Sequence, residues 1–241
     1  WFRQVNTNPD TSTSKALCRT VAGHEYPVTA LALSDNNQYI ASGDSGGTIR
    51  IWHMKDGKSA KSYTGHVGSI ITLKWISDEY LVSLGRDHIV KIWNWREQTE
   101  IKSLKIQSDR IRDFQIFEDN NQFVFCGENR KIVKGDFQNN SQNIIGEHNG
   151  RIFCLSLIFQ GKLVISGSED RTIKLWNLSE SNPDLMTLRG HNDSILSLAF
   201  FEDDQIIVSG SKDKTIREWD LKKGIEIRTL SGHQSQVNDV K

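Results

Sequence analysis

The chain repeats itself with a period of about 42 residues, and this period constrains the fold more than any other feature. Gly-His dipeptides, with Glu147-His148 as a near match, place histidines at intervals of 42, 82, 43 and 42 residues. A tryptophan series runs in the same frame, with glycine in one of its slots. The two series consist of His24, His66, His148, His191 and His233, and of Trp52, Trp93, Gly135, Trp176 and Trp219. Two series in one frame indicate a chain built from one repeated unit.

Each period holds four short runs that are rich in β-branched and aromatic residues and are separated by Gly, Asn, Asp and Ser. No segment shows a convincing helical pattern. The sequence therefore predicts an all-β fold of five complete four-stranded units with partial units at both ends. The expected boundaries are 1–23 (partial), 24–65, 66–107, 108–147, 148–190, 191–232 and 233–241 (partial).

A unit of this length that runs from Gly-His to a Trp slot, with four strands, resembles the WD-repeat family, and the resemblance covers essentially the whole chain. It implies a β-propeller, a radial array of four-stranded blades that bury their faces against one another. We expect residues 1–241 to be a single propeller domain or a fragment of one. A seven-bladed ring would need about 290 residues at this period, so a longer seven-bladed parent is expected, with a six-bladed ring as the alternative. We also expect an outer strand at 16–21 and an inner strand at 236–241.

Ser, His and Asp recur with Trp at fixed offsets and are the residue types of a catalytic triad. A hydrolase needs one such set beside an oxyanion hole, whereas this set recurs from unit to unit. The resemblance implies a structural network instead, in which Asp accepts from His, His is linked to Ser, and Ser reaches the indole N–H. The residues are His24, Ser42 and Trp52; His66, Ser83, Asp87 and Trp93; His148, Ser166, Asp170 and Trp176; and His191, Ser209, Asp213 and Trp219.

Two units depart from this pattern. The first carries Gly46 in the Asp slot, with Asp44 two residues early. The third has none of the four residues, because its slots hold Ser108, Phe125, Asn129 and Gly135. We expect the third blade to depend on apolar packing of Ile111, Phe114, Phe123 and Phe125, and to be the softest.

Composition argues against several classes of protein and of partner. The 30 Lys and Arg balance 30 Asp and Glu, and the resulting pI near 7.2 argues against nucleic acid as a partner, since there is no overall field to attract it. No run approaches the roughly 18–20 apolar residues of a membrane helix, and the first residues lack a signal-peptide layout. The odd number of cysteines, without a C-x-x-C pair, indicates neither a disulfide framework nor a zinc site. We expect an intracellular protein, cytoplasmic or nuclear, that does not insert into membranes.

Gly57-Lys58-Ser59 resembles the end of a phosphate-binding loop. That loop requires a glycine where Trp52 stands, and no helical pattern follows. We therefore predict no nucleotide site, no other cofactor and no metal.

The resemblance implies that partners bind the face formed by the loops that enter the first strands and by the turns between second and third strands. The loop candidates are Tyr26, Ser69, Arg110, Arg151 and Asn192, and the turn candidates are Ser45, Arg86, Glu128, Glu169 and Lys212. Loops on a rigid scaffold often carry function. The sequence thus predicts a non-catalytic scaffold that binds protein or peptide partners within a larger complex.

Two alternatives remain open. Arg86, Arg110 and Arg151 could form a basic arc for phosphate-bearing or nucleic-acid ligands, although Glu128 and Glu169 interrupt it.

The other alternative is a substrate-recruiting or regulatory arm of a multidomain enzyme or cullin-type ubiquitin ligase. The segment 92–96 resembles the Trp-Asp-x-Arg ending with which some propellers dock to the ligase adaptor. Asn94 replaces the acidic residue and Leu84 replaces a small one, so the match is incomplete.

Overall fold

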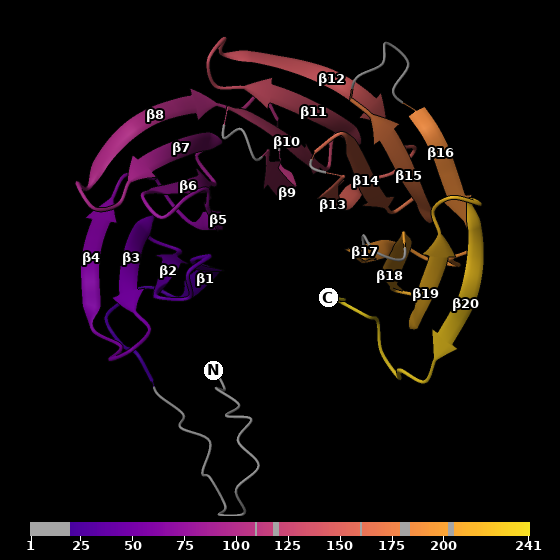
Figure 1. The fold of residues 1–241 in the computed structure, drawn as a ribbon, viewed down its shortest axis with the longest axis horizontal. Helices are drawn as coiled ribbons and strands as arrows, with labels where there is room; N and C mark the ends of the chain where they lie inside the picture. The colour runs from indigo at the N-terminus through magenta and orange to yellow at the C-terminus, as the bar shows by residue number, and fades with distance from the viewer. Residues whose placement is uncertain (1–19, 109, 118–120, 160, 179–183, 202–204) are drawn as a thin grey trace, which may run out of the picture. The chain divides into compact units, whose positions relative to one another are not determined.

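The structure, a computed structural model, describes residues 20–108, 110–117, 121–159, 161–178, 184–201 and 205–241. Within these ranges the chain forms strands, turns and loops without any helix, so no described helix could cross a membrane. The chain divides into two compact units, one up to Ser103 and the other from Leu104 to Lys241. Each unit consists of four-stranded antiparallel sheets, called blades one to five here in chain order (Figure 1).

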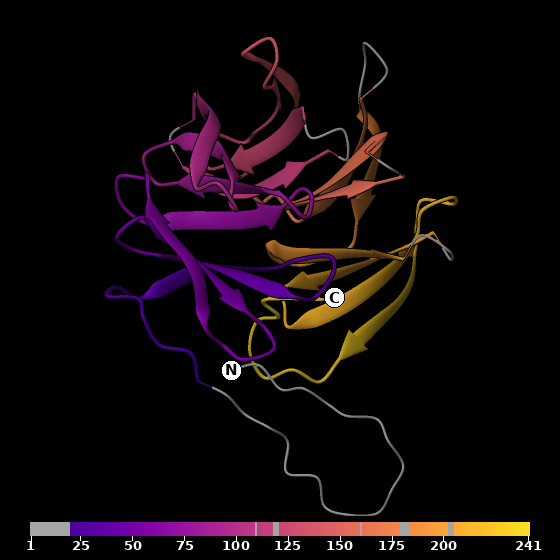
Figure 2. The same cartoon turned by 60° about the vertical axis from the view of Figure 1, so that its left-hand side comes forward.

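The first unit holds blades one and two, which Figure 2 turns toward the viewer. Blade one consists of β1 (Val28–Leu33), β2 (Tyr39–Asp44), β3 (Thr48–His53) and β4 (Ser59–Thr64). Blade two consists of β5 (Ile70–Trp75), β6 (Tyr80–Gly85), β7 (Ile89–Asn94) and β8 (Thr99–Lys105). In both, sequential strands are neighbours, and β8 runs across the boundary between the units.

The second unit holds blades three to five. Blade three consists of β9 (Ile111–Ile116), β10 (Gln122–Gly127), β11 (Lys131–Asp136) and β12 (Ser141–Glu147). Blade four consists of β13 (Ile152–Ile158), β14 (Leu163–Ser168), β15 (Thr172–Asn177) and β16 (Asp184–Arg189). Blade five consists of β17 (Ile195–Phe201), β18 (Ile206–Ser211), β19 (Thr215–Asp220) and β20 (Ile225–Ser231). The five sheets confirm the predicted all-β fold of four-stranded blades.

Neighbouring blades within a unit pack closely near their first strands. Gly167 in β14 faces β17, and a Cβ at this position would lie 2.7 Å from both Cys154 Sγ and Ile195 Cγ2. Because glycine has no Cβ, the side chain of Ile195 can pack directly against the β14 backbone, where it is buried. Ile195 belongs to a core cluster that also contains Ile173 and Trp219.

A β-bulge follows the first residue of every first strand. In β13, Ile152 pairs with Ser168 and Cys154 pairs with Gly167, so that Phe153 is the extra residue. The same shift in register occurs in β1, β5, β9 and β17. A bulge redirects the side chain of the extra residue, so these five positions differ from regular strand positions in where they point.

The expected inner strand at 236–241 is not a strand in the structure, since no described strand pairs with it. The segment nevertheless packs on blade five, where the amide of Val237 donates to the Ser211 carbonyl at 2.9 Å. Val237 is buried, and Asp239 accepts a hydrogen bond from the Ser197 hydroxyl at 3.0 Å. The expected outer strand at 16–21 lies almost entirely outside the described residues.

Candidate protein-binding face

A chain of side-chain hydrogen bonds runs through the inside of blade five. The Nε1 of Trp219 donates to Ser209 Oγ at 2.8 Å, and that oxygen lies 2.7 Å from His191 Nε2. On the other side of the ring, Nδ1 lies 2.7 Å from Asp213 Oδ2. Since a carboxylate only accepts, Nδ1 carries the proton, and Nε2 accepts from the serine hydroxyl. Every polar atom along this chain therefore has a partner.

The same chain of contacts recurs in blades one, two and four. Blade one joins Trp52, Ser42 and His24 to Asp44, which lies 2.8 Å from the His24 ring and takes the role of the absent Asp at position 46. The corresponding residues are Trp93, Ser83, His66 and Asp87 in blade two, and Trp176, Ser166, His148 and Asp170 in blade four.

Burial sets the protonation of these groups. It lowers the pKa of His66 and His191, and the nearby aspartates offset only part of that effect. Burial also acts to raise the pKa of Asp213, but hydrogen bonds from Thr215, the Asn192 amide and His191 outweigh it and hold the pKa far below its usual range. The two histidines are therefore neutral and Asp213 is ionised at neutral pH.

The buried serines are unsuited to nucleophilic catalysis. Ser83, Ser166 and Ser209 are fully buried, and each hydroxyl is shared between an imidazole and an indole. A substrate carbonyl would have to displace that packing to come within reach. Among the described residues, no three His, Cys, Asp or Glu side chains cluster as metal ligands.

Blade three replaces the network with phenylalanine rings. Phe123 lies where the tryptophan would stand, because a Cβ on Gly135 would be 2.1 Å from its Cζ. Its ring centroid is 4.6 Å from that of Phe137 and 5.4 Å from that of Phe114. All three rings are buried. A remnant of the polar link survives between two half-buried side chains, where Asn129 donates to Ser108 at 3.3 Å.

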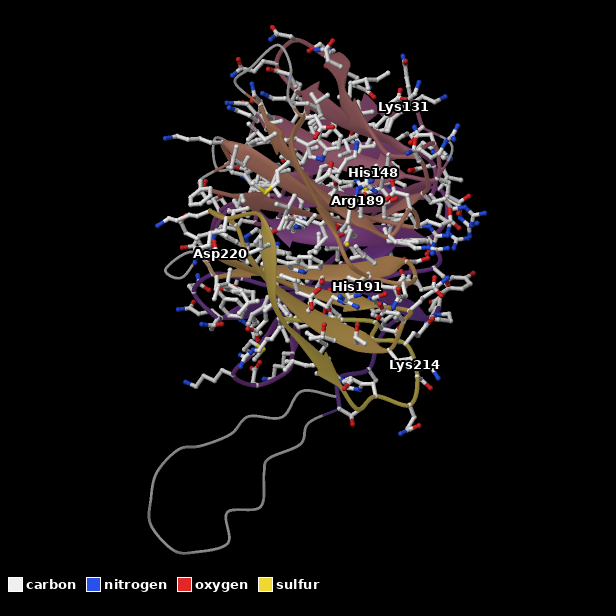
Figure 3. All side chains as sticks on the ribbon, turned by 90° about the vertical axis from the view of Figure 1, so that its right-hand side faces the viewer. Lys131, His148, Arg189, His191, Lys214 and Asp220 are labelled. Carbon is white, nitrogen blue, oxygen red and sulfur yellow. The ribbon has the colours of Figure 1, made fainter. Side chains whose placement is uncertain are left out.

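In every blade, one backbone hydrogen bond ties the turn between the second and third strands to the loop that enters the first strand. The amides of Ser45, Arg86, Glu128, Glu169 and Lys212 donate to the carbonyls of Pro27, Ser69, Arg110, Arg151 and Ser194, at 2.8–3.0 Å. Three of these bonds, in blades two, three and four, join two predicted candidates, whereas in blades one and five the carbonyl belongs to Pro27 and Ser194, close in sequence to Tyr26 and Asn192. Figure 3 views the second unit from the side, with Lys131 and Lys214, which adjoin these turns in sequence, toward one edge and Asp220 toward the opposite edge.

A recess of about 450 Å³ opens on this face of the second unit. It contains three predicted candidates, Arg151, Glu169 and Lys212. It also contains the bulge residues Arg112, Phe153 and Leu196, together with Gln236 and Asn238 of the C-terminal segment.

Phe153 is central to the recess and lies between two cations. The Arg112 guanidinium carbon is 5.6 Å and the Lys212 Nζ is 5.8 Å from the centroid of its ring. Both distances are within the range of cation–π attraction. The prediction missed the bulge residues, although each directly follows the apolar residue that starts its strand.

Two of the three arginines of the predicted arc, Arg110 and Arg151, form ion pairs with neighbouring glutamates. Arg110 Nη1 lies 3.3 Å from Glu128 Oε1, and Arg112 Nη2 lies 2.7 Å from the same oxygen. Arg151 Nε lies 3.7 Å from Glu169 Oε2.

The remaining candidates lie on the same kind of turn and loop. Tyr26, Arg86 and Asn192 are exposed. Ser45 and Ser69 are half-buried, and the Ser69 hydroxyl lies 3.4 Å from that of Thr29.

The adaptor-like segment is folded on itself. The Arg96 guanidinium stacks 4.7 Å from the centroid of the Trp95 ring. Asn94 accepts the amides of Arg96 and Glu97, both at 3.1 Å, and so acts as a turn cap in place of the acidic residue.

The profile of the family described as "WD domain, G-beta repeat" matches residues 15–53, 57–94, 139–177 and 182–220, more than half of the chain. The chain belongs to the WD-repeat family. The four matched WD repeats carry Trp52, Trp93, Trp176 and Trp219, and the range between the second and third of them contains β9 to β11 of blade three.

Several curated WD-repeat relatives are similar over part of their length. The SIR4-interacting protein SIF2 of Saccharomyces cerevisiae is 24% identical over 169 residues, 68% of this chain and 32% of the relative. The ribosome biogenesis protein YTM1 of Candida glabrata is 28% identical over 144 residues, 59% of this chain and 31% of the relative. The apoptotic protease-activating factor 1 of Rattus norvegicus is 24% identical over 167 residues, 69% of this chain and 13% of the relative. The chain thus spans about a third or less of these relatives.

Proposed function

We propose that this chain is a non-catalytic scaffold that holds protein partners within a larger intracellular complex. The observation that carries the proposal is the recess around Phe153, in which an aromatic ring on a β-bulge lies between Arg112 and Lys212. Aromatic and arginine side chains at the centre of a surface depression are typical anchors of protein interfaces.

The relatives support this class of function. The name of SIF2 describes an interaction with SIR4, and that of YTM1 describes a role in ribosome biogenesis. Both names indicate a role in multiprotein complexes, and neither identifies the partner of this chain.

The recess suits a peptide that offers an apolar side chain next to an acidic one. The apolar group would cover Phe153 and Leu196, while the carboxylate would pair with Lys212, whose side chain forms no ion pair with any described residue. The backbone bonds that tie each turn to its loop fix the anchors before binding, which reduces the entropy cost of association.

Crosslinking from inside the recess tests the proposal. A photo-reactive amino acid is placed at position 153, or at the exposed Lys222 in the turn after β19 as the matched control. We expect position 153 to capture a discrete partner that position 222 does not. The captured protein should then lose at least about tenfold in affinity for Phe153→Ala and Lys212→Glu, the scale of an interface anchor, and keep its affinity for Lys222→Glu.

Equal capture from both positions, or equal affinity of the three variants, would contradict the proposal. Each variant is also compared with the parent by circular dichroism and thermal unfolding, so that misfolding is not mistaken for lost binding.

The basic-arc alternative has less support, because Glu128 and Glu169 pair with its arginines. It predicts that Arg110→Glu abolishes a salt-dependent affinity for phosphate-bearing ligands. The scaffold proposal predicts that Lys212→Glu has the larger effect, on a protein partner.

A further inference from the structure

The outer part of blade five contains a clamp of three side chains. Arg217 in β19 forms an ion pair with Glu226 in β20, and the Thr229 hydroxyl donates to the same carboxylate. The register explains the contact, since Trp219 pairs with Glu226 and Arg217 pairs with Thr229. A cation, an anion and a hydroxyl thus share one side of the β19–β20 ribbon.

Blade four repeats the clamp. Lys174 pairs with Asp184 at 3.3 Å, and the register places Asp184 opposite Trp176 and Thr187 opposite Lys174. The Lys174 Nζ lies 5.1 Å from the centroid of the Trp176 ring.

Blade two repeats it once more, with Lys91 paired with Glu100. The Lys91 Nζ lies 5.5 Å from the centroid of the Trp93 ring. Hydrogen bonds from Lys91 and Ser103 lower the pKa of Glu100 despite its partial burial, so this carboxylate is an anion at neutral pH.

Blade one keeps two parts of the clamp and lacks the third. Its register places Ser62 opposite Arg50 and Ser59 opposite Trp52, where blades four and five carry the acidic residue. The Arg50 guanidinium lies over Trp52, 5.9 Å from the ring centroid. Its Nε is buried without a hydrogen-bond partner, as is that of Arg217. Arg217 is nevertheless neutralised by Glu226, whereas Arg50 forms no ion pair with any described residue.

A hollow opens beside Arg50. This polar hollow of about 240 Å³ is lined by Arg50, Ser62, Thr48 and Thr64 together with Glu25 and Asp44. Asp44 is already bonded to His24, and neither carboxylate forms an ion pair with the guanidinium. The hollow therefore holds a guanidinium without a direct ion pair, the Ser62 hydroxyl and two carboxylates, so a phosphate has to approach Arg50 from the Ser62 side, where β4 carries Ser59.

We propose that Ser59 is a phosphorylation site and that its phosphate takes the place of the missing carboxylate between Arg50 and Ser62. Ser59 is exposed and begins β4, which pairs only with β3 within its sheet. A protein kinase can therefore reach it from the solvent side.

In the reaction, Ser59 Oγ forms a bond to the γ-phosphorus of ATP as the bond to the β–γ bridging oxygen breaks. ADP leaves, and the hydroxyl proton passes to the kinase base. The product carries nearly two negative charges and three acceptor oxygens, which suit a guanidinium and a hydroxyl.

The test compares four proteins, with serine or genetically encoded phosphoserine at position 59 in the Arg50 and the Arg50→Gln backgrounds. With Arg50 present, phosphoserine should raise the melting temperature by about 2–4 °C. In Arg50→Gln it should produce no rise. Phosphorus NMR should show the second pKa of the phosphate, ordinarily near 6, lowered by about one unit only where Arg50 is present. The Ser59→Glu variant is expected to be stabilised in the same Arg50-dependent way.

Mass spectrometry of the protein isolated from its own cells with phosphatase inhibitors should find phosphate on Ser59. The proposal is overturned if phosphoserine has the same effect in both backgrounds, or if Ser59 is recovered only unmodified. These outcomes do not depend on the recess around Phe153, so they are separate from the test of the scaffold function.

Discussion

Trp219 donates its indole N–H to the hydroxyl of Ser209, ten residues earlier in the chain, at 2.8 Å. The same hydroxyl is bonded to His191 at 2.7 Å, so that one serine satisfies two ring nitrogens inside blade five. Because Ser209 is fully buried, water cannot replace it without opening the blade.

Ser209→Ala should destabilise the protein markedly. The change leaves the nitrogens of Trp219 and His191 buried without a partner, at a cost of about 1–3 kcal/mol for each group. Urea unfolding followed by tryptophan fluorescence measures the loss. The exposed Ser235→Ala is the control and should change the free energy of unfolding by less than about 0.5 kcal/mol; similar losses in both variants would contradict the assigned role.

Asp44→Ala should loosen the first turn of blade one, and Gly46→Asp should not restore it. Asp44 accepts from His24 and from the amides of Gly46 and Thr48, all within 2.9 Å. A Cβ at position 46 would lie 2.4 Å from Cδ2 of Tyr26, so an aspartate there would displace that ring. We expect the double variant to melt no higher than Asp44→Ala alone in calorimetry. Recovery of the parent melting temperature would show that the two positions are equivalent.

Stability should fall as the pH drops below neutrality. The pKa values of His66 and His191 are lowered in the folded state, so the unfolded chain takes up protons first, near its ordinary histidine pKa of about 6.5. This proton uptake favours unfolding.

Asp170 and Asp213 add to the loss below about pH 4, because their pKa values are also lowered on folding. Urea midpoints measured from pH 8 to pH 5 should decline with falling pH. The decline should be shallower in a His66→Gln, His191→Gln double variant. A midpoint that is constant from pH 8 to pH 5 would contradict the lowered pKa values of the two histidines.

Phe123→Ala should cost about 3–5 kcal/mol, the usual loss for a large buried aromatic side chain. Gly135→Trp alone should also be destabilising, since a Cβ at position 135 would lie 2.1 Å from Cζ of Phe123. The double variant should be more stable than the sum of the two single losses predicts, because the indole would fill the cavity that Phe123 leaves. Additive losses would show that the two positions do not share one space.

Blade three should open before blade five. It lacks the buried His-Ser-Trp bonds and retains only the 3.3 Å contact between Asn129 and Ser108. Hydrogen–deuterium exchange should therefore be faster in β10 and β11 than in β18 and β19. Slower or equal exchange in β10 and β11 would show that the phenylalanine cluster is as effective as the network.

The repeat period predicted the fold because each blade is a local meander in which partners lie at fixed offsets. Ser209 and Trp219, for example, sit on neighbouring strands of one sheet, so their spacing in sequence determines their spacing in the structure. The role of Asp44 did not follow from the period, because a carboxylate two residues earlier reaches His24 only through the particular shape of that turn.

The recess was harder to predict than the blades. Phe153 joins it because a bulge makes this residue the extra one in its strand, and bulges depend on backbone geometry that hydrophobic alternation does not reveal. Arg112 and Lys212 reach the same ring from the two neighbouring blades. Only the packing of blades three to five brings these residues together.

The bond between each turn and its loop joins an amide to a carbonyl and uses no side chain. Any residue with a backbone N–H can therefore occupy positions 45, 86, 128, 169 and 212, and proline alone is excluded. The blades therefore tolerate substitution at these five positions. Such substitutions can change which partner the face binds without changing the fold.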